Sequence, residues 1–167
     1  MVVRYFRIKY PHTSLWLSGH SLGGSVASLV GIRWGLPTVT FEAPGERLAA
    51  LRMGLVESIP DALTLSHITH VYNNVDPVAQ GLCVGALSLC AQAGYAIEAK
   101  CHTSRVIMYD LQKPGWKLAI QAHRMDQVLE ILENEEMPVP EAIPQVDCQV
   151  SPSRLVKSIY SLTRHLP

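Results

Sequence analysis

The chain contains 167 residues, of which 14 are Lys or Arg and 14 are Asp or Glu, so its length suits one modest domain and its formal net charge is zero. This balance argues against a nucleic-acid-binding protein, because such proteins normally carry a clear basic excess. Hydrophobic residues make up 48% of the chain and charged residues 17%, which is enough apolar material for a core and excludes an intrinsically disordered chain.

Strand-like and helix-like segments alternate along the chain. Apolar and β-branched runs predict strands at residues 15–18, 37–41, 70–72, 105–109 and 116–120. Helical patterns predict helices at residues 22–34, 46–55 and 125–133. This order is typical of an α/β fold with a mainly parallel sheet and flanking helices. Residues 134–145 hold three prolines and three acids and predict extended surface chain, whereas the basic residues 151–167 contain one weak helical stripe.

No targeting signal or membrane span is expected in this chain. Residues 77–97 form a long stretch without a charge, but glutamines, glycines and cysteines interrupt it. At the N-terminus Arg4, Arg7 and Lys9 break up the apolar residues before the core of a signal peptide could form.

The cysteines favour an oxidising compartment. Cys83, Cys90, Cys101 and Cys148 are even in number, and three of them fall within 19 residues, which is typical of disulfides. Three pairings are possible, and the alternative is a set of four reduced thiols in the core. A zinc site is not expected, because the sequence has no C-x-x-C pair and no histidine at finger spacing from two thiols.

A Gly-x-Ser-x-Gly pattern lies between a predicted strand and a predicted helix, at residues 19–23. This is the context of a nucleophile elbow, in which a tight turn strains the serine backbone and requires small flanking residues. We therefore expect Ser21 to be a nucleophile, with Gly19 and Gly23 removing a steric collision. The alternative is a glycine-rich turn between a strand and a helix that performs no chemistry.

Small residues continue into the helix that follows the pattern. Gly24 and Ala27 are expected to let this helix approach the strand, with its N-terminus directed at the serine. The backbone N–H of Leu22 is then the expected donor to an oxyanion, assisted by the helix dipole.

A serine nucleophile requires a histidine base and an acid that orients the histidine. On an α/β-hydrolase scaffold the three follow in the order Ser, acid, His. Asp76 is the favoured acid, because it directly follows a predicted strand and because α/β sites assemble at the C-terminal ends of strands. Glu42, at the end of the preceding strand, is the rival acid, and its other possible role is that of a cap or turn partner.

Three histidines follow the favoured acid, namely His102, His123 and His165. His123 is the favoured base, because it lies in a short loop after the last predicted strand and before the closing helix. His102 follows a cysteine that a disulfide could hold, and His165 lies in the tail. His20, inside the pattern, is expected to pack or to hydrogen-bond beside the site.

Several segments together resemble a known family. They are residues 16–24, 35–46, 70–72 with 76–77, 93–95 with 101–102, and 138–142 with 146–148. On these segments the chain is similar to the class 3 lipases and, more narrowly, to the fungal lipases that degrade autophagic bodies in the vacuole. The resemblance covers residues 8–148, and residues 41–46 together with the cysteine-bearing segment narrow it to the fungal group.

The resemblance implies an α/β-hydrolase fold, with residues 1–148 as the C-terminal part of a class 3 lipase-like domain and 149–167 as a divergent tail. It implies a triad of Ser21, Asp76 and His123 that needs no cofactor or metal. The implied substrates are triacylglycerol and phospholipid at membrane surfaces. The implied location is the endosomal-vacuolar lumen, including the multivesicular body, to which an N-terminal anchor brings members of the family.

In that family several strands, a lid and a second oxyanion donor come before the elbow, whereas only 20 residues precede Ser21 here. We therefore expect an N-terminally truncated form. The uncharged residues 78–97 could offer an apolar surface for lipid, or could be an ordinary buried loop. Two alternatives to a lipase stay open: a catalytically incomplete fragment or interaction remnant, and a soluble esterase similar to cutinases or thioesterases.

Overall fold

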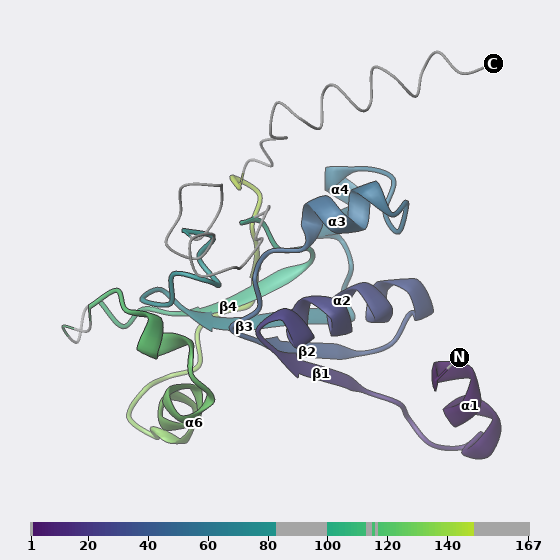
Figure 1. Ribbon diagram of the computed structural model, residues 1–167, viewed down its shortest axis with the longest axis horizontal. Helices are drawn as coiled ribbons and strands as arrows, with labels where there is room; N and C mark the ends of the chain where they lie inside the picture. Colours follow the sequence, from purple (N-terminus) through teal and green to yellow (C-terminus); the bar gives the residue numbers. More distant parts are fainter. Residues whose placement is uncertain (1, 83–99, 113–114, 116, 149–167) are drawn as a thin grey trace, which may run out of the picture.

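A single sheet organises the part of the chain that the computed structural model describes, which is residues 2–82, 100–112, 115 and 117–148. Its strands are β1 (Leu17–His20), β2 (Thr38–Phe41), β3 (Ile68–Asn73), β4 (Arg105–Tyr109) and β5 (Ile143–Pro144). They lie side by side in chain order; the first four are parallel, and β5 is antiparallel to β4 (Figure 1). The prediction of an α/β fold with a mainly parallel sheet is confirmed.

Helices cover both faces of this sheet. The helix α2 (Leu22–Trp34) lies on the face that carries Thr38 and Ile68, and α6 (Met125–Glu133) lies on the face where Ile131 packs with Val71 and Tyr109 (Figure 1). Two short helices, α3 (Arg47–Arg52) and α4 (Ile59–Leu63), connect β2 to β3. The first helix, α1 (Val2–Lys9), reaches the end of α2, where Arg7 donates a hydrogen bond to the backbone oxygen of Trp34 at 3.0 Å.

Small residues allow α2 to approach the sheet closely. A Cβ atom at Gly24 would lie 2.8 Å from the Cβ of Ala43, and a Cβ atom at Gly31 would lie 2.1 Å from Oγ1 of Thr38. The expectation for Gly24 is therefore confirmed. Ala27 is only half-buried, and the residues of α2 that are buried are Gly24, Ser25, Ser28 and Gly31.

The strand predicted at residues 116–120 is wrong for the residues that the structure describes. Residues 117–119 have no regular structure, and Ile120–His123 form a 3-10 helix, η1. The reason is that β5 pairs with the edge of β4, so this segment cannot pair with β4. The backbone N–H of Ala119 instead donates to the oxygen of Val75 at 3.1 Å, in the loop that follows β3.

The remaining predicted elements are confirmed; the ranges 22–34, 105–109 and 125–133 match α2, β4 and α6, and the other elements have shifted ends. The strand expected at residues 15–18 is β1, and the helix expected at 46–55 is the shorter α3. Residues 134–145 are mostly exposed extended chain, as predicted, and they contribute β5. The helices α1 and α4 were not predicted, and the helical stripe expected at 151–167 lies outside the described residues.

A disulfide joins Cys101 to Cys148 across 47 residues, as expected of the cysteines. Arg47 holds the same two regions together, because its guanidinium donates to the backbone oxygens of His102, Gln145 and Cys148. Residues 145–148, which follow β5, are thus joined to residues 101–102, which precede β4, by one covalent bond, and Arg47 of α3 binds both regions through three hydrogen bonds. Any pairing of the other two cysteines lies outside the described residues.

Within the described part of the chain, no helix has both the length and the apolar character needed to cross a membrane. Most of the uncharged stretch at 77–97 falls outside the described residues.

Candidate active site

The turn between β1 and α2 has the backbone of a nucleophile elbow. Ser21 has φ 55° and ψ −135°, in a region that residues with a side chain rarely adopt, and its N–H donates to the oxygen of Phe41 at 3.0 Å. A Cβ atom at Gly19 would lie 2.4 Å from the backbone oxygen of Gly23, so glycine is required there. At Gly23 a Cβ atom would meet nothing within 4 Å, so the expected collision at that position is wrong.

The three side chains predicted as a triad meet in one hydrogen-bonded line. Nε2 of His123 lies 2.7 Å from Oγ of Ser21, and Nδ1 lies 2.8 Å from Oδ2 of Asp76. The Asp76 side chain is fully buried, and that of His123 is 17% exposed. A carboxylate can only accept, so Nδ1 carries the proton and Nε2 is free to accept the serine hydroxyl hydrogen. The catalytic roles of the three residues stay a prediction.

Three different elements of the fold deliver these side chains. Ser21 is the residue between β1 and α2, Asp76 lies just after β3, and His123 ends η1. The second oxygen of Asp76, Oδ1, accepts a hydrogen bond from the backbone N–H of Val78 at 2.8 Å, which holds the carboxylate in place. Because β1 to β3 are parallel and adjacent, the loops that follow β1 and β3 open at the same end of the sheet.

The rival acid, Glu42, lies behind the favoured acid. Its side chain is 1% exposed, and its Oε1 accepts hydrogen bonds from the backbone N–H and the side-chain amide of Asn73 at 3.1 and 2.8 Å. Burial, followed by the hydrogen bond to Asp76 and the charge on Asp76, raises the pKa of Glu42 to about 10. Asp76 is therefore the carboxylate that contacts the base, and burial beside Asp76 disfavours the charged form of Glu42.

The other candidate histidines have different surroundings. Nε2 of His20 donates to the backbone oxygen of His123 at 2.7 Å, and the two rings lie 4.9 Å apart, so His20 supports the base as expected. His102 is buried, with Nε2 2.8 Å from the backbone oxygen of Ala43. His165 lies outside the described residues.

The expected oxyanion donor begins α2. Leu22 is the first residue of this helix, so its N–H has no partner within the helix. The same amide follows the nucleophile directly, at the positive end of the helix dipole. Its position therefore suits the stabilisation of negative charge on a substrate carbonyl bound over Ser21.

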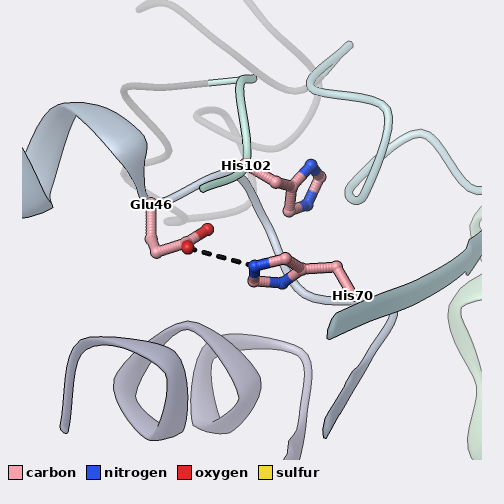
Figure 2. A group of neighbouring side chains, drawn as sticks. All are labelled: Glu46, His70 and His102. Carbon is pink, nitrogen blue, oxygen red and sulfur yellow. Dashed lines mark ion pairs between the residues drawn. The ribbon is translucent and has the colours of Figure 1, made fainter. Parts of the chain in front are cut away.

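A second buried polar cluster lies on the α2 face of the sheet, formed by Glu46, His70 and His102 (Figure 2). Figure 2 shows the ring of His70 directed at the Glu46 carboxylate, with 3.2 Å between Nε2 and Oε1. Nδ1 of His70 contacts the hydroxyl of Thr40, and Oε1 of Glu46 also accepts from Ser28 and Thr103. Most of the potential ligand atoms are thus already hydrogen-bonded, and the cluster fits an internal polar network better than a metal site.

Two supporting residues could not be assigned from the sequence. Asn73 donates both to Glu42 and, at 3.2 Å, to the backbone oxygen of Ala122, the residue before the histidine base. In the sequence it is visible only as a strand-breaking Asn-Asn pair. Glu42 was weighed as the triad acid because it ends a strand, and that position is also what places it against Asp76.

Comparisons with known proteins point to one family. Residues 2–35 match the family model described as Lipase (class 3). The chain is 46% identical to a protein of Mycosarcoma maydis named putative lipase ATG15, over 76% of this chain and 26% of that protein. Proteins of the same name from Cryptococcus neoformans and Lodderomyces elongisporus are 47% and 42% identical, over 72% and 81% of this chain.

This chain spans about a quarter of the length of these relatives, namely 26%, 24% and 25% of the three proteins. The similarity extends over most of the present sequence and includes the elbow, and the parallel sheet with flanking helices is the architecture expected of an α/β-hydrolase. By its sequence and its fold, the chain belongs to the family of these fungal autophagy-related lipases, within the class 3 lipases.

Proposed function

We propose that Ser21, His123 and Asp76 are the catalytic triad of a carboxylic ester hydrolase that acts on lipid esters. The observation that carries this proposal is the hydrogen-bonded line from the serine hydroxyl through the imidazole to the buried carboxylate, at 2.7 and 2.8 Å. Membership of the lipase family supports the same reaction class. The proposed substrates are triacylglycerol and membrane phospholipid.

The proposed reaction follows from the protonation states of the three groups. Nε2 of His123 takes the hydroxyl proton of Ser21 while Oγ adds to the ester carbonyl, and Asp76 stabilises the imidazolium that forms. The oxyanion is placed against the N–H of Leu22. The imidazolium then gives its proton to the departing alcohol, leaving an acyl-enzyme. Water, deprotonated by the same nitrogen, releases the fatty acid and restores the serine.

Exposed apolar side chains near the triad support a lipid substrate. Leu22 directly follows the nucleophile, Ile120 comes three residues before the base, and Leu82 comes six residues after the acid. These side chains are 69%, 54% and 56% exposed. Large exposed apolar groups that lie within six residues of each triad residue favour acyl chains and interfaces over small polar esters.

The proposed location is the endosomal-vacuolar lumen, where the enzyme would meet its substrate at membrane surfaces. The disulfide between Cys101 and Cys148 supports an oxidising compartment rather than a reducing one.

A fluorophosphonate probe tests the nucleophile, because it reacts covalently only with an activated serine. We expect the full chain to be labelled at Ser21, as located by peptide mapping. Ser21→Ala should abolish labelling, whereas Ser66→Ala, a matched change of an exposed serine in the turn before β3, should not. Labelling elsewhere, labelling that persists in Ser21→Ala, or no labelling of a cooperatively folded chain would refute the proposal.

The substrate class is tested with long-chain and short-chain esters, each as monomers and at a lipid interface. A lipid hydrolase should favour the long-chain esters at the interface. Hydrolysis restricted to soluble short-chain esters would replace the lipase by an esterase of the cutinase or thioesterase kind.

A further inference from the structure

A buried carboxyl group stands behind the triad acid, and the proposed mechanism does not use it. Glu42 follows β2, and its side chain is 1% exposed. Oε1 is saturated by two donors from Asn73, whereas Oε2 is buried without a partner if the group is ionised. A buried carboxylate oxygen with no donor is costly, so the ionised form does not suit this environment.

Asp76, the neighbouring acid, offers Oε2 of Glu42 the hydrogen-bond partner that it lacks. Asp76 lies close enough to Glu42 to raise the pKa of Glu42 both through a hydrogen bond between the side chains and through its charge. Two carboxylates cannot share a hydrogen bond unless one of them carries a proton. Asp76 already accepts from His123 Nδ1 and from the N–H of Val78, which stabilises its charge, so the proton belongs on Glu42.

The backbone at Glu42 has an unusual conformation next to the nucleophile. Glu42 has φ 45°, in the left-handed region that disfavours residues with a Cβ atom. Its N–H donates to the oxygen of Val71 at 2.9 Å, while the preceding carbonyl, of Phe41, accepts the N–H of Ser21. The strained residue thus directly follows the peptide group that holds the backbone of Ser21.

From this arrangement we infer that Glu42 is a positioning residue, held as a neutral acid whose Oε2–H donates to the Asp76 carboxylate and fixes it against His123. The inference rests on the proposed function of the triad. A neutral Glu42 leaves one negative charge, that of Asp76, behind the imidazole of His123 instead of two. A donor to Asp76 also withdraws some of that charge, which limits how strongly Asp76 favours the imidazolium.

The other ionisable groups near Glu42 agree with a neutral side chain. Burial and then Asp76 raise the pKa of Glu42 to about 10, and the hydrogen bonds from Asn73 oppose this rise by smaller amounts. Tyr72, on β3, is another ionisable group that interacts with Glu42. Burial raises the pKa of Tyr72, and the charge of Glu42 adds a smaller contribution.

The test is a pH titration of His123 by side-chain nitrogen NMR, with the full chain labelled in histidine. Glu42→Gln keeps an N–H donor toward Asp76 and an oxygen acceptor for Asn73, so the pKa of His123 should stay within about 0.3 of its original value. Glu42→Leu removes the donor, which should raise the pKa of His123 by about one unit. If Glu42 were ionised, Glu42→Gln would remove a negative charge and lower the pKa of His123 by about one unit, which would overturn the inference.

A second measurement does not depend on a folded leucine variant. In the full chain labelled with carbon-13 at the glutamate carboxyls, the Glu42 signal, assigned by its loss in Glu42→Gln, should be that of a protonated acid at pH 7. An ionised signal at pH 7, or an unchanged His123 titration in a folded Glu42→Leu, would refute the donor role. Neither readout needs turnover, so labelling of Ser21 decides the proposed function separately from these results.

Discussion

Removing the disulfide between Cys101 and Cys148 should cost a large part of the stability of this chain. The bond closes a loop of 47 residues. In the chain-entropy account a crosslink of this length restricts the unfolded state by about 4 kcal/mol at 25 °C. Domains are typically stable by about 5 to 15 kcal/mol, so the loss is a substantial fraction. The midpoint of thermal unfolding should fall by about 10 °C for a chain of this size.

The measurement is urea unfolding of Cys101→Ala, Cys148→Ala and the double variant, followed by circular dichroism. Either single change already opens the loop, so all three should lose nearly the same free energy, and the two single losses should not add. The unchanged chain in a reducing buffer should lose at least as much. A loss below about 1 kcal/mol would show that the three hydrogen bonds of Arg47 hold the segment without the crosslink, and would refute the loop-entropy argument.

Two further predictions follow from the candidate site and from the second polar cluster. Asp76→Asn should reduce ester turnover and probe labelling by about 10⁴-fold, because the amide favours the wrong tautomer of His123; a loss below tenfold would contradict the assigned role. Burial opposes ionisation of Glu46, but the charge and hydrogen bond of His70 hold its pKa to about 2. Since this pKa lies below the unfolded value, the stability that Glu46 contributes is present above about pH 4.5 and is lost as the pH falls toward 2. Glu46→Gln should therefore flatten the acid limb of the free energy of unfolding, measured by urea titration from pH 2 to 6, and an unchanged slope would contradict the pairing.

The first half of the sheet could be predicted because local patterns decide it. The β-branched run before Phe41 and the small residues of α2 are short-range signals, and both elements form where they were expected. The order Ser, acid, His also restricted the search, because it left three histidines after Asp76. These inferences needed no knowledge of which chain segments meet in space.

The error at residues 116–120 has a long-range cause. Those residues have strand-like composition, but the edge of β4 is occupied by β5, which lies more than thirty residues further along the chain than β4. Nothing local in the proline-rich segment that contains Ile143 marks it as the partner of β4. Proline is tolerated at the outer strand of a sheet, which is where Pro144 lies.

The choice between Glu42 and Asp76 also needed the tertiary structure, since both acids follow strands of the same parallel sheet. Parallel strands bring their C-terminal ends together, so the two carboxyl groups must compete for one buried space. Only one of them can be charged there without a neighbouring cation, and the acid that contacts His123 gains most from its charge. The end of β2 then supports the triad twice, since Phe41 holds the backbone of Ser21 and Glu42 meets the carboxylate of Asp76. Two acids at adjacent strand ends are therefore better interpreted as partners with different protonation states than as alternatives for one role.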